Sequence, residues 1–209
     1  MQELKKLCEE ALQYNFYAVC VPPPLVKNAR NILNTAESSV KTATVIGFPF
    51  GYSIARAKLA EAQQAIQDGA DELDVVINLV ALKNKAWQYL ELEMESIVEI
   101  AHTNNKLVKV IIESGILSDE EIIKCCELYA KAGVDFLKTS TGYAEKGATI
   151  EAVQLMRAHL PSNIKIKASG GIRTWEQADQ YIKAGANRLG CSASVAIVNG
   201  EKSSSPNGY

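Results

Sequence analysis

The stretch Val134-Asp135-Phe136-Leu137-Lys138-Thr139-Ser140-Thr141-Gly142 places a lysine inside an apolar, β-rich segment that ends at a glycine. A second stretch, Ile164-Lys165-Ile166-Lys167-Ala168-Ser169-Gly170-Gly171, repeats this arrangement. Both patterns predict short strands. Side chains alternate between the two faces of a strand, so an apolar face that packs against helices would place Lys138 and Lys167 on the opposite face.

A lysine in such a position needs a partner or a task, because lysine is almost never fully buried without one. A solvated strand face would also explain a single lysine of this kind. Two such strands, each closed by a glycine-containing turn, favour a functional site.

The two strands belong to a repeat that runs along the chain. Strands are predicted to begin near residues 16, 42, 72, 107, 135, 164 and 187, and a helix follows each. Three helix-to-strand joints look alike, and each has a glycine, at Gly69, Gly133 and Gly185. This βα repeat predicts a parallel sheet. Charged residues on inner strand faces favour a (β/α)8 barrel, whose active site lies at the carboxyl ends of the strands, over an open sheet with two apolar faces.

Helix boundaries can be predicted from the capping residues. Ser118 with Glu121, and Thr174 with Gln177, have the spacing of capping boxes. Ser53 is expected to cap the alanine-rich helix that runs to Asp68 and stops at Gly69, and Ser192 is expected to open a short final helix.

Length and composition indicate one domain over residues 1–200, followed by a polar tail at 201–209. The chain has 209 residues, of which 47% are hydrophobic and 22% charged, and a net charge of −2. This charge suggests neither nucleic acid nor an anionic membrane as a partner. No apolar run reaches the length of a membrane span. An odd number of cysteines, five, and only two histidines argue against a disulfide framework and a histidine-rich metal site. We expect a reduced, cytoplasmic protein.

Four charged residues would project inward from successive strands of a barrel, namely Asp74, Lys109, Lys138 and Lys167. Repulsion between ammonium groups and burial both lower the pKa of a lysine. A neutral lysine attacks a carbonyl group and forms a Schiff base. Asp74 could relay protons. A buried Lys–Asp–Lys ion-pair network would also perturb pKa values and is the alternative.

Two glycine-containing turns predict a phosphate site. Gly170-Gly171-Ile172-Arg173 follows one strand, and Gly190-Cys191-Ser192 follows the last. Backbone N–H groups in a glycine turn or at a helix N-terminus bind anions, and barrels often bind phosphate at these two loops. Two ordinary turns are the alternative.

Together with these stretches, Val45-Ile46-Gly47-Phe48-Pro49 and Asp71-Glu72-Leu73-Asp74-Val75-Val76-Ile77-Asn78 resemble the deoxyribose-phosphate aldolase family, from about residue 6 to 199. The resemblance implies a (β/α)8 barrel and a class I aldolase without metal or other cofactor. It implies cleavage of 2-deoxy-D-ribose 5-phosphate to acetaldehyde and D-glyceraldehyde 3-phosphate, in deoxyribonucleotide catabolism. It also implies a small sugar phosphate as ligand and a homo-oligomer, either a dimer or a tetramer.

The resemblance implies a role for each matching residue. Lys138 matches the Schiff-base lysine, Lys167 the lysine that lowers its pKa, Asp74 the proton-relay acid, and Lys109 a supporting inner lysine. Tyr209 resembles a C-terminal tyrosine that reaches into the site. The residues expected to bind substrate or phosphate are Thr141, Gly142, Gly170, Gly171, Arg173, Gly190 and Ser192.

One departure from the family stays open. Family members begin with a further strand, whereas this sequence starts within the helix after it, so seven of eight βα units are expected here. Such a chain would leave open strand edges and be unstable as a closed monomer. Two other functions are therefore compatible with the sequence: another phosphate-binding barrel enzyme, or a truncated, weakly active or inactive homologue that acts as a binding or structural protein.

Overall fold

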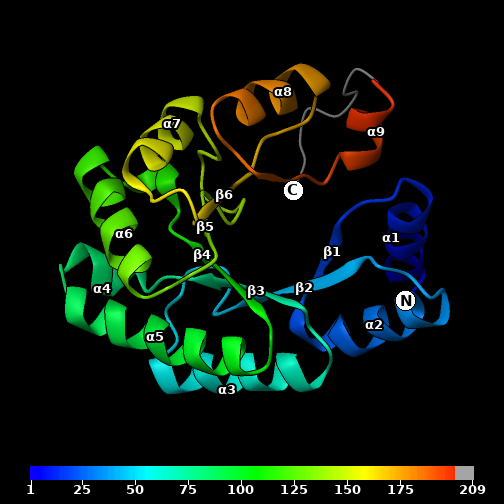
Figure 1. Ribbon diagram of the computed structural model, residues 1–209, viewed down its shortest axis with the longest axis horizontal. Helices are drawn as coiled ribbons and strands as arrows, with labels where there is room; N and C mark the ends of the chain where they lie inside the picture. Colours follow the sequence, from blue (N-terminus) through cyan, green and yellow to red (C-terminus); the bar gives the residue numbers. More distant parts are fainter. Residues whose placement is uncertain (201–209) are drawn as a thin grey trace. The chain divides into compact units, whose positions relative to one another are not determined.

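Strands and helices alternate along the chain, as the repeated helix–glycine–strand joints predict. The structure, a computed structural model, describes residues 1–200. The chain divides into two compact units, Met1–Val108 and a second unit that begins at Lys109. In each unit the strands are parallel, and Figure 1 shows the helices of a unit on one side of its strands. No helix within residues 1–200 is long and apolar enough to cross a membrane.

The first unit contains three strands in sequence order, with Ala18 in register with Lys41 and Ala43 with Glu72. A fourth strand starts at the end of this unit, where Leu107 N donates to Asp71 O over 3.1 Å. The elements of this unit are α1 (Gln2–Gln13), β1 (Ala18–Val21), η1 (Pro23–Leu25), α2 (Val26–Thr35), β2 (Lys41–Ile46), α3 (Ala55–Gln67), β3 (Glu72–Val76), α4 (Leu79–Lys83), α5 (Trp87–Thr103) and β4 (Leu107–Ile111), the last of which continues into the second unit.

The second unit repeats the βα pattern around the two lysine stretches. Its strands again follow in sequence order, from the end of β4 through β5 and β6 to β7. The elements are η2 (Ser114–Ile116), α6 (Asp119–Lys131), β5 (Phe136–Lys138), α7 (Ile150–His159), β6 (Lys165–Ser169), α8 (Trp175–Lys183), β7 (Arg188–Gly190) and α9 (Ser194–Val198).

The alternation of side chains in the strands agrees with the prediction from the sequence. Val110, Leu137, Ile166 and Ala168 lie on one face of the second unit's strands and are fully buried. They form the apolar face predicted for these strands. The charged residues of the same strands therefore occupy the opposite face.

The helix ends confirm most of the predicted boundaries. Both capping boxes are present, at Ser118 and at Thr174. Ser53 was expected to cap α3, and this prediction is wrong: Ile54 is the N-cap and no side chain caps this helix, because the extended backbone continues one residue further. The last helix begins at Ser194, two residues after the predicted Ser192.

Candidate active site

Lys138 and Lys167 lie side by side on neighbouring strands. Lys138 is the last residue of β5, and its register partner on β6 is Lys167. Adjacent strands are about 4.8 Å apart, and register partners in a parallel pair point to the same face. Both lysines are buried, with 6% and 5% of their surfaces exposed. The structure thus brings together two ammonium-bearing side chains that the sequence separates by a complete βα unit.

Lys109 adds a third lysine to this face. It lies on β4 in register with Phe136, two residues before Lys138 on β5, and it is fully buried. Residues two apart on a strand share a face. Three lysines from three consecutive strands therefore line one face of the second unit, as the sequence predicted.

The amino-terminal end of the same face carries further cations around one aromatic ring. Lys165 Nζ lies 5.7 Å from the centre of the Phe136 ring, and Arg188 Cζ lies 4.8 Å from it. Both are cation–π contacts. Arg188 was not singled out from the sequence. Its place in the last strand, in register with Lys167, was the available signal.

Gly190 makes room for the side chain of Lys167. A Cβ atom at this position would lie 3.1 Å from Lys167 Cε and 3.0 Å from Ser169 Cβ. The next residue, Cys191, is largely shielded from solvent, and this burial raises the pKa of its thiol to about 11 although the Lys167 charge acts in the opposite direction. A thiol with this pKa is protonated at neutral pH, so Cys191 is a poor candidate for the nucleophile.

A buried acid, Glu113, lies two residues after the end of β4 and contacts Thr141, the third residue after β5. Its carboxylate accepts hydrogen bonds from Thr141 N, over 3.2 and 3.3 Å, and from the Thr141 hydroxyl. Its backbone is in the left-handed region, with φ of 56°, which is uncommon for a residue other than glycine. Burial raises the pKa of Glu113, whereas the hydrogen bonds from Thr141 and the charge of Lys138 act against this shift.

The Thr141 hydroxyl, predicted from the resemblance to contact substrate, thus has protein partners. Besides its bond to Glu113, it accepts a hydrogen bond from Tyr143 N over 3.1 Å. These contacts hold the start of the loop that follows Lys138. Substrate binding by Thr141 and by its neighbour Gly142, which has a φ of 93°, stays a prediction.

The loops after β5 and β6 pack against each other, backbone to backbone. Ala148 N donates to Ser169 O and Gly170 O over 3.1 and 3.2 Å. A Cβ atom at Gly147 would lie 2.4 Å from Gly170 O, and Gly170 itself has a φ of 90°. Ser169 Oγ donates to Ser140 O over 2.7 Å. Two glycines are therefore required for this close approach, which joins the loop after Lys138 to the loop after Lys167.

The remaining predicted phosphate residues lie in the loops that follow β6 and β7. These loops start side by side, because Ser169 and Gly190 are in register. Gly171 is exposed, and a Cβ atom there would meet nothing within 4 Å, so its backbone faces open space. Arg173 N donates to Gln177 Oε1 over 2.8 Å at the start of α8, and Ser192 is exposed.

Three residues complete the comparison with the sequence predictions. Asp74 lies in the first unit, fully buried in β3 and in register with Val45. Tyr209 lies outside the described residues. Ser140 was not predicted as a site residue, yet it lies two residues after Lys138, and its hydroxyl is buried and has no hydrogen-bond partner among residues 1–200. A buried hydroxyl of this kind is a natural position for a ligand contact.

Comparisons with known proteins show the family to which the chain belongs. A family described as DeoC/LacD family aldolase matches residues 1–199. The deoxyribose-phosphate aldolase of Thermococcus gammatolerans is 51% identical over 96% of this chain and 89% of its own length. The deoxyribose-phosphate aldolase of Listeria monocytogenes is 48% identical over 100% of this chain and 92% of its own length.

Solved structures support the same assignment of the fold. The deoxyribose phosphate aldolase from Aeropyrum pernix, described as a tetramer, has a TM-score of 0.88 and 32% identity over 95% of this chain and 82% of its own. An aldolase named QR15 has a TM-score of 0.89 and 41% identity over 95% of this chain and 87% of its own. The chain has an α/β fold of the TIM-barrel type, with seven parallel strands in the part that the structure describes.

Proposed function

The chain belongs to the DeoC/LacD family of aldolases, and we propose that it is a class I deoxyribose-phosphate aldolase. It cleaves 2-deoxy-D-ribose 5-phosphate into acetaldehyde and D-glyceraldehyde 3-phosphate, in the catabolism of deoxyribonucleotides. The observation that supports this most strongly is the pairing of Lys138 with Lys167 in adjacent positions of β5 and β6, both buried. The names of the relatives from Thermococcus gammatolerans and Listeria monocytogenes support the substrate.

Lys138 is the proposed nucleophile. Lys167 beside it and the burial of both residues disfavour protonation, so a fraction of Lys138 is a neutral amine near pH 7. The amine adds to C1 of the open-chain aldehyde, and loss of water gives a protonated imine. A base then removes the proton of the C3 hydroxyl, the C2–C3 bond breaks, and its electron pair moves into an enamine while C3 becomes the aldehyde of glyceraldehyde 3-phosphate. Protonation at C2 and hydrolysis release acetaldehyde and regenerate Lys138.

Three acids and bases have proposed supporting roles. Lys167 keeps the pKa of Lys138 low through charge repulsion, and Lys109 adds a third positive charge on the same face. Asp74 is the proposed proton relay. Its burial in β3 supports this role, because a carboxyl group shielded from water exchanges protons with bound groups in preference to solvent.

The phosphate group is proposed to bind where the loops after β6 and β7 start side by side. The open space above Gly171 and the exposed Ser192 support this position. Backbone N–H groups of a glycine turn suit a phosphate dianion. Gly170, Gly190 and Arg173 complete the proposed site, and the buried Ser140 hydroxyl is an additional candidate for contact with the sugar.

The two other functions compatible with the sequence are less well supported. Another phosphate-binding barrel enzyme would not require two register-paired lysines. An inactive homologue would not need to keep Lys109, Lys138 and Lys167 buried on one face, where their mutual repulsion costs stability.

We also propose that the protein is a homo-oligomer in the cytoplasm. The tetramer described for the Aeropyrum pernix relative supports self-association. Five free cysteines, three of them buried, are compatible with a reducing compartment.

An assay of aldol cleavage combined with borohydride trapping tests the proposed function. The protein is incubated with 2-deoxyribose 5-phosphate with and without borohydride, and acetaldehyde release and protein mass are measured. Without borohydride we expect turnover. With borohydride we expect inactivation and an added mass on the peptide that contains Lys138. The proposal is refuted if the protein shows no turnover and no added mass at saturating substrate.

A further inference from the structure

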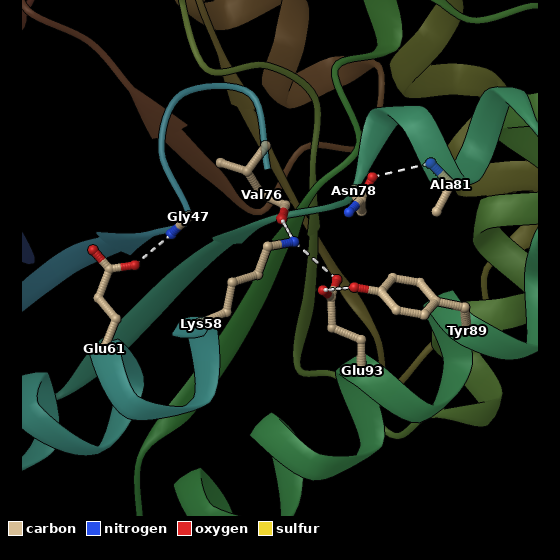
Figure 2. A network of polar contacts seen from close by, with 8 residues as sticks. All are labelled: Gly47, Lys58, Glu61, Val76, Asn78, Ala81, Tyr89 and Glu93. Carbon is tan, nitrogen blue, oxygen red and sulfur yellow. Dashed lines mark hydrogen bonds and ion pairs between the residues drawn. The ribbon is translucent and has the colours of Figure 1, made fainter. Parts of the chain in front are cut away.

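A second buried lysine system lies in the first unit, at the end of the strand that carries Asp74. Lys58 comes from the buried stripe of α3 and has no exposed surface. Its ammonium donates to Val76 O over 2.9 Å and to Glu93 Oε2 of α5 over 2.8 Å. Figure 2 shows Lys58 reaching from α3 to the carboxyl end of β3, with Glu93 on the other side of its ammonium group.

The acid in this pair is equally buried and is held by a second helix residue. The Glu93 side chain is 1% exposed, and Tyr89 Oη donates to its second oxygen over 3.3 Å. Burial disfavours the charge on both partners: it raises the pKa of Glu93 and lowers the pKa of Lys58, while their mutual attraction opposes both shifts. A buried ion pair of this kind is seldom the most stable arrangement, since apolar side chains of equal size often do as well. A role in specifying geometry would explain its presence.

The geometry that Lys58 determines includes the loop after β2. Gly47 has a φ of 65°, and a Cβ atom there would lie 2.8 Å from Lys58 Cε, so the loop runs directly over the lysine side chain. Gly47 N donates to Glu61 Oε2 over 2.6 Å, one turn further along α3. Gly51, at the other end of the loop, lies against β3, because a Cβ atom there would be 1.8 Å from Ile77 O. Lys58 thus contacts both the loop and the end of β3.

The bond to Val76 O is two residues from Asp74 on the same strand. Asn78 lies two residues after Val76, and its side chain caps α4 by accepting a hydrogen bond from Ala81 N over 3.0 Å (Figure 2). Lys58 therefore ties to α3 and α5 the strand end that lies two residues after Asp74. Displacement of a catalytic group by about 1 Å can lower a rate by about 10²-fold.

We propose that Lys58, held by Glu93, is a positioning residue of the aldolase reaction, which keeps the carboxyl end of β3 and hence the Asp74 carboxylate in place for proton transfer. This inference rests on the proposed function, because the proton relay by Asp74 is part of it. Lys58 acts through β3 and has no contact with substrate in this role.

The chain offers a matched control at the opposite end of the same strand. Arg30 Nη1 donates to Asp71 Oδ2 over 3.0 Å, and Asp71 directly precedes β3. The same oxygen accepts a hydrogen bond from Thr42 N over 3.0 Å. Arg30→Met removes an ion pair from the amino end of β3 and leaves the carboxyl end untouched.

The experiment measures two steps separately for the parent, Lys58→Met, Glu93→Gln, Arg30→Met and, as the reference for a lost relay, Asp74→Asn. The first step is imine formation, measured as acetaldehyde trapped by borohydride. The second is exchange of the acetaldehyde methyl protons for deuterium in D2O, which requires proton transfer at the enamine carbon. We expect Lys58→Met and Glu93→Gln to trap acetaldehyde like the parent but to exchange protons about 10- to 100-fold more slowly. Arg30→Met is expected to match the parent in both steps.

Two results would contradict these expectations. Exchange rates of Lys58→Met and Glu93→Gln within twofold of that of Arg30→Met would overturn the positioning role and leave the pair purely structural. Absence of trapping in the parent would instead overturn the proposed function. If Lys58→Met does not fold, the double variant Lys58→Met/Glu93→Met is used in its place, because it leaves no buried charge unpaired. The same slow exchange is expected for it.

Discussion

Lys138 and Lys167 are register partners on β5 and β6, so the two amines project side by side from the same face of the strands. No other side chain position of this face lies between the two lysines, because β5 and β6 are neighbouring strands. This adjacency makes the charge on one amine depend on the charge of the other. In the proposed mechanism, Lys138 forms the bond to the substrate carbon while Lys167 stays charged.

Removal of the Lys138 amine is expected to abolish covalent trapping. Lys138→Ala has no nucleophile, and Lys138→Arg does not restore one because a guanidinium group stays protonated. Borohydride reduction with substrate, followed by peptide mass mapping, measures this. An added mass on the Lys167 peptide of the parent would show that the roles of the two lysines are reversed.

Replacement of the neighbouring amine should change the pH dependence of the reaction. In Lys167→Leu the repulsion between Lys167 and Lys138 is gone, so Lys138 is protonated to a greater extent at pH 7 and the optimum of kcat moves to higher pH. The pH–rate profiles of parent and variant are compared from pH 6 to pH 10. A profile that keeps its shape and position would rule out Lys167 as the partner that lowers the pKa of Lys138.

A negative charge in the proposed phosphate site should discriminate between phosphorylated and unphosphorylated substrates. Ser192 is exposed, so Ser192→Glu is expected to fold normally and to repel the phosphate dianion. We expect KM to rise at least about tenfold for deoxyribose 5-phosphate, which corresponds to about 1.4 kcal/mol, and to change little for deoxyribose. Asn199→Glu, exposed beyond the end of α9, is the control for added charge. An equal rise for both sugars would place the phosphate elsewhere.

The raised pKa of Glu113 predicts a pH-dependent contribution to stability. A carboxyl group whose pKa is higher in the folded protein contributes stability below its unfolded pKa, and this contribution is lost as pH rises through the folded pKa. Relative to Glu113→Gln, which does not titrate, the parent should therefore lose unfolding free energy between pH 4 and pH 7. Urea unfolding at several pH values measures the difference. A parent that instead gains stability over the variant across this range would show that the bonds from Thr141 outweigh burial.

Removing one partner of the Lys58–Glu93 pair should lower the free energy of unfolding much more than replacing both partners. Lys58→Met leaves the Glu93 carboxylate buried without its cation, at a cost of about 3–5 kcal/mol. This loss should be smaller at pH 5 than at pH 7, because burial raises the pKa of Glu93 and protonation removes the unpaired charge. Lys58→Met/Glu93→Met should regain most of the lost stability. Denaturant unfolding of the three proteins gives the values, and additive losses in the double variant would argue against a coupled pair.

Much of this protein can be predicted from local patterns in its sequence. The alternation in Ile164–Ala168 placed Lys165 and Lys167 on one face, and the capping boxes at Ser118 and Thr174 gave two helix starts that the structure confirms. Each of these signals involves residues within a few positions of each other, where backbone geometry leaves little choice. The missing cap at Ser53 shows the limit of such signals, since a serine near a helix start caps it only if the backbone bends at that residue.

Only the tertiary structure decided which side chains contact each other. Three features join residues that are 18 to 35 positions apart: the register that pairs Lys138 with Lys167, the hydrogen bonds between Glu113 and Thr141, and the burial of Lys58 between β3 and Glu93. No local pattern in the sequence announces Lys58 as a buried cation, because an isolated lysine in an alanine-rich helix looks like a solvated residue. Its burial becomes favourable only when α5 supplies an acid and β3 supplies a carbonyl at the same point, and such a meeting of three elements is a property of packing.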